Sequence, residues 1–241
     1  MSERWRKEGL ISSNKKKIAS ADREMSKRSL DIEKKSFDII DTEIGAHYYN
    51  NLEWVIVRRV IHATADFDFA KKGRIIFHKD AIESAFNAIE NKCNIVTDVD
   101  MVLSGINKKS VTSLGLKAMC YISNESLIDE SRKSNRTRSE IAMRHAANEM
   151  YGGIVAIGNA PTALYETIKM IREGVTKPSV VIGVPVGFVS AHESKEELMK
   201  TYIPFITNVG RKGGSPAASS IVNAIMLLYQ GKSEQKINMP T

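Results

Sequence analysis

The segment around His62 has the residue types needed for acid–base chemistry beside an anion. It runs from Arg58 to Asp68 (RRVIHATADFD), with two arginines one turn before the histidine and two aspartates one turn after it. Imidazole titrates near neutral pH and suits proton donation, and anions held beside it would help to keep it protonated. Apolar residues at i, i+3 and i+7 mark one helix face here, and Arg58 and His62 share another. The sequence therefore predicts a helix with a titratable group next to a cation.

Three predicted strands end in loops rich in Gly and Pro, at 154–164, 180–190 and 208–216. Pro161 is placed to open a helix, and Ser215 is the predicted N-cap of another. Tight turns alone would explain one such loop. Three at one edge, two with Lys or Arg in or beside the turn, favour a carboxylate or phosphate ligand on the backbone N–H groups. None has Walker A or G-x-G-x-x-G spacing, so ATP and NAD are disfavoured.

Beyond Gly73, short β-branched runs alternate with helical patterns. Upstream, apolar spacing predicts a helix from about Leu30 to near Gly45. The predicted strands are 94–97, 117–121, 153–157, 179–182 and 205–208, and the later helices are 79–91, 99–105, 137–151, 161–173, 193–200 and 215–230. Continuously apolar strands indicate burial on both faces, and hence a parallel sheet with helices on both faces. The predicted fold is doubly wound α/β, in which ligands bind beyond the carboxyl ends of the strands.

The composition is that of an ordinary globular protein, with 42% hydrophobic and 26% charged residues in 241. It argues against disorder and against a disulfide-stapled miniprotein. The net charge is +7, but residues 1–35 carry +5 of it, which leaves +2 for the other residues. We therefore expect a basic, polar arm at 1–30, a single domain at 31–230 and a polar tail at 231–241. A nearly neutral domain argues against a nucleic-acid interface.

Neither Cys93 nor Cys120 has CxxC or His-flanked spacing, so we expect no zinc site and no disulfide. No apolar run reaches the roughly 18 residues of a membrane span, and the charged start has no apolar signal core. The expected compartment is the cytoplasm, with no membrane partner.

Six collinear motifs between about Ile32 and Leu228 resemble the precorrin-8X methylmutase family. They are Arg59–Asp66 (RVIHATAD), Thr97–Val102 (TDVDMV) with Gly105, Thr137–Ser139 (TRS), Ala156–Leu164 (AIGNAPTAL), Gly183–Lys195 (GVPVGFVSAHESK) and Gly210–Pro216 (GRKGGSP). His192 departs from the family pattern, where a small residue is expected before Glu-Ser-Lys.

The resemblance implies an isomerase of corrin biosynthesis. It would move a methyl group from carbon 11 to carbon 12 of precorrin-8X or cobalt-precorrin-8, giving hydrogenobyrinic or cobyrinic acid. The implied fold is flavodoxin-like, the assembly a homodimer, and no separate cofactor or protein-bound metal is used. The essential histidine falls on His62. The residues expected to bind the corrinoid are Ser36, Arg58, Arg59, Thr64, Asp98, Gly105, Arg138, Asn159, Thr162, Glu193, Ser194, Lys195, Gly213, Gly214 and Ser215.

The chemistry agrees with these residues. A sigmatropic methyl shift needs no nucleophile, metal or redox partner, whereas a proton on the macrocycle would make the π-system more electron-poor and help the methyl group to migrate. Substrate carboxylates call for arginine forks and helix N-termini. Two alternatives stay open: a non-catalytic corrinoid carrier, and a nucleic-acid-binding protein that uses the basic arm. The sequence leaves open whether the substrate contains cobalt, what the arm does and which subunit supplies each contact.

Overall fold

The computed structural model describes residues 27–237, and the chain divides into two units, Met1–Gly45 and Ala46–Thr241. In the first unit, residues 27–44 form one helix, as the apolar spacing before Gly45 predicts. Most of the predicted arm lies outside the described residues. Residues 231–237 of the predicted tail are helical, and residues 238–241 lie outside the described residues. The domain boundaries stay predictions.

The second unit is built on a six-stranded sheet in the order β1-β6-β5-β4-β2-β3. The strands are β1 (Ile75–Phe77), β2 (Ile95–Thr97), β3 (Ala118–Cys120), β4 (Ile154–Ile157), β5 (Val180–Gly183) and β6 (Phe205–Asn208). Strands β2 to β6 are parallel, with Thr97 opposite Ala156 and Ile182 opposite Ile206. Their order, β3-β2-β4-β5-β6, is that of a flavodoxin-like doubly wound fold.

All five predicted strands are confirmed, but the sheet is not wholly parallel. Strand β1 pairs antiparallel with β6, with Ile75 opposite Asn208. The prediction missed this strand, although Ile75–Phe77 is an apolar run as long as β2 and β3; its antiparallel pairing with β6 has no local signal in the sequence. Two short α-helices were also missed, α5 (Lys108–Ser113) and α6 (Glu125–Lys133), because both are mostly polar and contain only one or two apolar residues.

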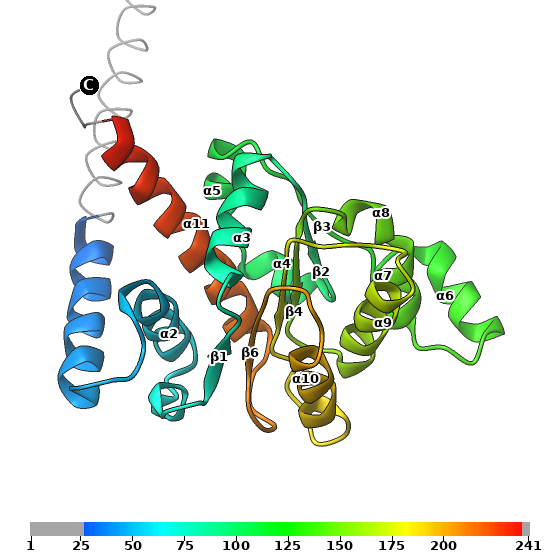
Figure 1. Ribbon diagram of the computed structural model, residues 1–241, viewed down its shortest axis with the longest axis horizontal. Helices are drawn as coiled ribbons and strands as arrows, with labels where there is room; N and C mark the ends of the chain where they lie inside the picture. The colour runs from blue at the N-terminus through cyan, green and yellow to red at the C-terminus, as the bar shows by residue number, and fades with distance from the viewer. Residues whose placement is uncertain (1–26, 238–241) are drawn as a thin grey trace, which may run out of the picture. The chain divides into compact units, whose positions relative to one another are not determined.

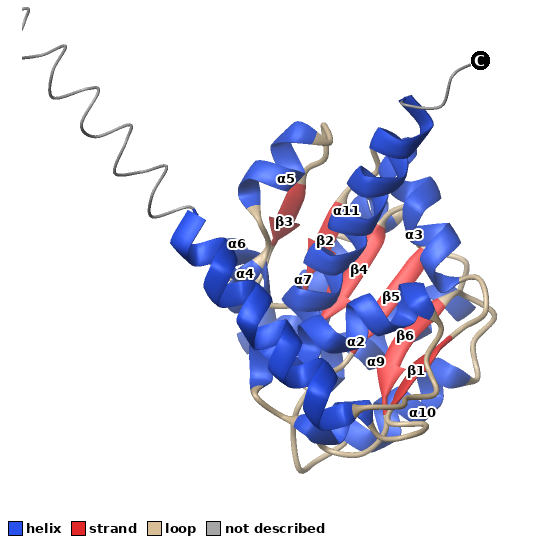
Figure 2. Ribbon diagram, turned by 90° about the vertical axis from the view of Figure 1, so that its left-hand side faces the viewer, coloured by secondary structure: helices blue, strands red, loops and turns tan. Residues whose placement is uncertain are grey.

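Helices cover both faces of the sheet (Figure 1). On one face, α2 (Asn51–Thr64), α3 (Ala81–Glu90) and α4 (Asp100–Gly105) pack against the long helix α11 (Ser215–Ile237). On the other, α9 (Pro161–Arg172) packs between α7 (Arg138–His145) and α10 (Ala191–Met199). The remaining helical segments are the 3-10 helix η1 (Phe67–Ala70) and α8 (Ala147–Met150). Figure 2 shows α11 and α2 lying across the sheet.

The core follows from the apolar strands and the inner faces of these helices. Every residue of β2, β4, β5 and β6 is buried, as continuous apolar runs predict. Helix α9 adds Leu164, Ile168 and Ile171 to the main core cluster. Among the described residues, no helix has the length and apolarity that a membrane crossing requires.

Gly158 lies where the end of β4 meets the start of α11. A Cβ at this position would lie 2.8 Å from Ser215 Cα and 3.0 Å from the Gly214 carbonyl oxygen. Both atoms belong to the backbone, so neither can move aside without shifting the helix. The close approach therefore requires glycine at residue 158.

We expect Gly158→Ala to lower the free energy of unfolding by about 1–3 kcal/mol, the range for overpacking. Gly231→Ala is the matched control, because a Cβ at Gly231 in α11 meets no atom within 4 Å. Alanine there should raise stability by up to about 1 kcal/mol. Urea denaturation of both variants measures the effects. An unchanged midpoint for Gly158→Ala would contradict the packing argument.

Candidate active site

Asp98 fixes the loop that follows β4, at the centre of the carboxyl edge of the sheet. Its buried carboxylate accepts hydrogen bonds from the backbone N–H groups of Gly158 (3.1 Å), Asn159 (2.8 Å) and Ala160 (2.8 Å). Burial raises the pKa of the Asp98 carboxyl, and these three N–H groups act in the opposite direction. Asp98 follows β2 and the loop follows β4, so the contact joins the two strands at the topological switch point, where doubly wound folds bind ligands.

A cluster of hydroxyl groups connects that loop to the start of α7. Thr137 is the N-cap of α7 and forms a capping box with Glu140. Thr162, in the first turn of α9, lies 2.8 Å from the Ser139 hydroxyl and 3.1 Å from the Thr137 hydroxyl. Arg138 is exposed, and its guanidinium has no hydrogen bond or ion pair within the described part of the chain.

Glu166 of α9 forms ion pairs with two arginines on either side of the start of α7. Its side chain is 3% exposed, and its carboxylate accepts from Arg136 (3.1 and 3.2 Å) and from Arg144 Nε. Arg144 also pairs with Glu173 at 3.1 Å. A buried carboxylate needs such partners, because desolvation without them would be costly. The two arginines flank Arg138 in sequence and therefore fix the backbone that presents it.

The loops after β5 and β6 are hydrogen-bonded to each other. The N–H of Gly187 donates to the Arg211 carbonyl (3.1 Å), and the N–H of Gly214 donates to the Val184 carbonyl (2.9 Å). Between them Gly213 has φ 146°, and a Cβ there would lie 2.2 Å from the Val184 oxygen. This close approach explains the paired glycines of the third loop. At the rim, Phe188 is 85% exposed and lies 5.6 Å beneath the Arg211 guanidinium.

Lys195 lies in α10 and is 1% exposed, and its side chain reaches the start of the loop after β6. Its Nζ donates to the Lys212 carbonyl (2.8 Å) and to Asn208 Oδ1 (3.3 Å), and Asn208 Nδ2 donates to the same carbonyl (2.6 Å). Burial lowers the pKa of Lys195 to about 8, and the nearby Arg74 acts in the same direction. The buried Lys195 ammonium therefore fixes the loop after β6 by hydrogen bonds.

His62 lies, exposed, in the last turn of α2. The helix begins because the Asn50 side chain accepts from the N–H groups of Leu52 and Glu53, and it ends at Ala65, which has φ 52°. Arg58 and Arg59 lie one turn earlier and are half-buried.

The aspartates that follow His62 approach the third loop. Lys212 Nζ lies 2.7 Å from Asp66 Oδ2 and 2.6 Å from Asp68 Oδ2. The segment after His62 is thus in direct contact with the loop after β6. The end of helix α2 therefore lies beside the carboxyl edge of the sheet.

The remaining predicted residues occupy three kinds of position. The Thr64 hydroxyl donates to the Val60 carbonyl, and the buried Ser194 hydroxyl donates to the Ala191 carbonyl. Ser36 belongs to the first unit, where its hydroxyl donates to the Ile32 carbonyl. The residues at the surface or at the loop backbone are Gly105, Asn159, Glu193 and Gly214.

The structure corrects the prediction that Ser215 is a helix N-cap. Helix α11 starts at Ser215 itself, and the Gly214 carbonyl accepts the N–H of Ala218, so Gly214 occupies the N-cap position predicted for Ser215. The Ser215 hydroxyl is buried and has no partner among the described residues. A hydroxyl group without a partner at a ligand-binding edge is suited to a ligand oxygen.

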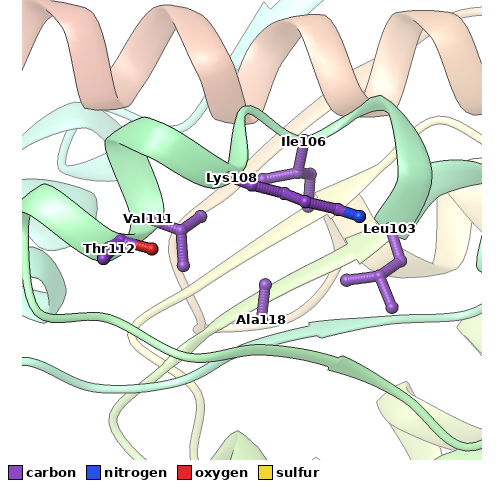
Figure 3. A pocket seen from close by; sticks show the side chains of 6 residues that line it. All are labelled: Leu103, Ile106, Lys108, Val111, Thr112 and Ala118. Carbon is purple, nitrogen blue, oxygen red and sulfur yellow. The ribbon is translucent and has the colours of Figure 1, made fainter. Parts of the chain in front are cut away.

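A separate cavity of about 310 Å³ lies between α4, α5 and the start of β3 (Figure 3). It is lined by Leu103, Ile106, Lys108, Val111, Thr112 and Ala118. Ala118 opens β3, so the cavity lies away from the strand-end loops. The described residues contain no cluster of three or more His, Cys, Asp or Glu that could hold a metal ion.

Comparison with known proteins decides the family. Residues 31–228 match the family model described as precorrin-8X methylmutase. The chain belongs to the precorrin-8X methylmutase family. It is accordingly an isomerase of corrin biosynthesis.

Named relatives and a solved structure agree with this assignment. The cobalt-precorrin-8 methylmutase of Priestia megaterium is 48% identical over 85% of this chain and 92% of its own length. The precorrin-8X methylmutase of a Sinorhizobium species is 31% identical over 80% of this chain and 92% of its own. A crystal structure of precorrin-8X methyl mutase from Thermus thermophilus has a TM-score of 0.77 and 36% identity, covering 83% of this chain and 96% of that one.

Sequence reasoning missed the groups that position the methylmutase loops. Glu166 has a visible signal, because it is an acidic residue on the apolar face of the helix that begins at Pro161. Asn208 ends a buried strand, which also marks it. The partners of Lys212 had no such signal, since Asp66 and Asp68 lie more than 140 residues away in sequence.

The pH dependence of stability should reveal buried Lys195. In the unfolded chain its ammonium keeps its proton to about pH 10.5, whereas in the folded protein it loses it near pH 8. Between these values the unfolded state binds more protons, so stability rises with pH. Relative to Lys195→Met, the wild type should gain about 1–3 kcal/mol from pH 8 to pH 10.5 in urea denaturation.

Lys200→Met is the control for this measurement, because Lys200 is an exposed lysine next to the end of the same helix. Its difference from the wild type should not rise over that interval. A flat difference for Lys195→Met would show that Lys195 keeps an ordinary pKa in the fold.

Proposed function

We propose that this chain converts cobalt-precorrin-8 to cobyrinic acid by moving a methyl group from carbon 11 to carbon 12, with His62 as the proton donor. The observation that carries the proposal is the contact of Lys212 with Asp66 and Asp68. It brings the segment directly after His62 to the strand-end loops, which offer cations and N–H groups for a polycarboxylate.

The reaction is an isomerisation, so atoms balance without a co-reactant. The bond from carbon 11 to the methyl group breaks as the bond from carbon 12 forms. A proton given to the macrocycle by His62 withdraws electron density from the π-system and favours migration. Because substrate and product are isomers, that proton is returned before the next turnover.

Substrate carboxylates are assigned to groups that face solvent at the loops. Arg138 at the N-terminus of α7 and Arg211 above Phe188 can form bidentate contacts, and the Ser215 hydroxyl can donate to a carboxylate oxygen. The other predicted binding residues keep that assignment as part of the proposal, except Ser194, whose buried hydroxyl donates to the Ala191 carbonyl. Asp98 and Lys195 serve it indirectly, through the loops that they hold.

The identity of the relatives supports a substrate that contains cobalt. Three relatives at 48%, 44% and 38% identity are named cobalt-precorrin-8 methylmutases, whereas two at 31% and 34% are named precorrin-8X methylmutases. We also propose a homodimer, on family membership, and the cytoplasm as its compartment. The free cysteines Cys93 and Cys120 support that compartment.

We expect His62→Ala to lower kcat by about 10²–10⁴-fold, the usual contribution of acid–base catalysis. Corrinoid binding and the unfolding midpoint should stay close to those of the wild type, because the side chain is exposed. Stopped-flow spectra of the isomerisation measure kcat. His145→Ala, at an exposed position at the end of α7, is the control. A His62→Ala variant with more than about a third of the wild-type kcat would remove His62 from the mechanism.

Arg138→Lys should weaken binding of the corrinoid product by about 1–3 kcal/mol, because lysine keeps the charge and loses the bidentate geometry. Its melting temperature should not change. Arg136→Lys is the matched control two residues away: it loosens the Glu166 pair, so it should lower the melting temperature and affect product affinity less. Unchanged affinity in Arg138→Lys with a lowered melting temperature would overturn the binding assignment.

Parallel assays with the two substrate forms test the cobalt preference. We expect kcat/KM to be higher for cobalt-precorrin-8 than for metal-free precorrin-8X. The reverse order would assign the chain to the metal-free reaction. Tight binding of both forms with no spectral change would favour the carrier alternative, which family membership does not favour.

A further inference from the structure

Two neighbouring cations in the loop after β6 have different surroundings. Arg211 faces solvent and lies over the Phe188 ring. Lys212 instead has its ammonium between two carboxylates, with Nζ 2.7 Å from Asp66 Oδ2, 2.9 Å from Asp66 Oδ1 and 2.6 Å from Asp68 Oδ2. The side chain is 45% exposed, but these two carboxylates already pair with its charge, which makes it a poor partner for a substrate carboxylate.

Lys212 is held at both ends. Its carbonyl oxygen accepts from Lys195 Nζ at 2.8 Å and from Asn208 Nδ2 at 2.6 Å. Lys195 belongs to α10 and Asn208 to β6, so this end is fixed to the sheet. The ammonium end reaches the carboxylates after α2. One residue thus connects the sheet to the end of the helix that carries His62.

The two aspartates also fix the local backbone that follows His62. Asp66 is the N-cap of η1, and its Oδ1 accepts the N–H of Asp68 at 3.0 Å. Directly before it, the N–H of Ala65 donates to the Ile61 carbonyl at 2.7 Å and closes α2. A shift of Asp66 would therefore be passed to the last turn of the helix, where His62 lies.

We propose that Lys212, with Asp66 and Asp68, is a positioning residue that sets the place of His62 relative to the strand-end loops. We call this set the Lys212 bridge. The inference rests on the proposed role of His62. Lys212 and Lys71 hold the pKa of Asp68 down to about 2, and hydrogen bonds to the aspartates raise the pKa of Lys212, so the Lys212–Asp68 pair is charged near neutral pH. Such a bridge acts on kcat, because the imidazole must meet the macrocycle in one geometry.

Lys212→Met tests the bridge, with Lys71→Met as the matched control. Lys71 Nζ lies 2.6 Å from the other oxygen of Asp68, Oδ1, but Lys71 comes from the same turn, so this ion pair does not connect Asp68 to the loop after β6. We expect Lys212→Met to lower kcat by about 10-fold to 100-fold, with less than a twofold change in product Kd. Lys71→Met should keep the wild-type kcat, and Lys212→Arg should recover most of it. Asp68→Asn should reproduce part of the loss from the other side.

The double variant His62→Ala/Lys212→Met separates the possible outcomes. If the bridge acts through His62, the second substitution adds no further loss of kcat to His62→Ala. A further loss of the same size, a Lys212→Met enzyme with wild-type kcat and only a lower melting temperature, or failure of Lys212→Arg to restore activity would each overturn the bridge. So would a product Kd that weakens as much as kcat falls, which would make Lys212 a substrate ligand. Full activity of His62→Ala alone would instead overturn the proposed function.

Discussion

The site depends on one carboxylate that satisfies three backbone N–H groups at the switch point of the sheet. Burial removes the water that would hydrate the Asp98 carboxylate, and the N–H groups of residues 158–160 replace it as hydrogen-bond donors. The loop they fix leads directly into α9, whose Thr162 hydroxyl meets those of Ser139 and Thr137. Two sets of hydrogen bonds, joined by the chain from Ala160 to Thr162, thus connect Asp98 to the segment that carries Arg138.

The charged residues around Asp98 are of two kinds. Some fix the loops through ion pairs, and others face solvent, where we propose that the ligand binds. Arg136 binds the buried Glu166, whereas Arg138, two residues later, faces solvent. Lys212 binds two aspartates, whereas its neighbour Arg211 faces solvent. A ligand with several carboxylates needs cations whose geometry is set before it arrives. Ion pairs within the protein fix the loops without using Arg138 and Arg211, the cations that we propose meet the substrate.

Local and long-range contacts explain which elements could be predicted. Strands β2 to β6 are continuous apolar runs and α9 has a strong apolar stripe, so the sequence predicts them by itself. Strand β1 is also an apolar run of three residues and was missed, and its antiparallel pairing with β6 is decided by the tertiary structure. Helices α5 and α6 are polar and are stabilised by side-chain N-caps, Asn107 and Asn124, which a search for apolar periodicity does not detect. The N-cap of α11 was predicted at Ser215, one residue too late, because Gly214 occupies that position.

The sequence alone determined the doubly wound fold class and the family, and it singled out the three loops and the histidine that we propose as the site, because each depends on residues close together in the chain. Tertiary structure decided what individual charged groups do. Asp98, Lys195 and Lys212 look like ligand-binding residues in the motifs, yet their polar atoms are occupied by loop backbone or by carboxylates far away in sequence. Whether a charge is buried and paired depends on the packing of the whole domain, which no local pattern contains.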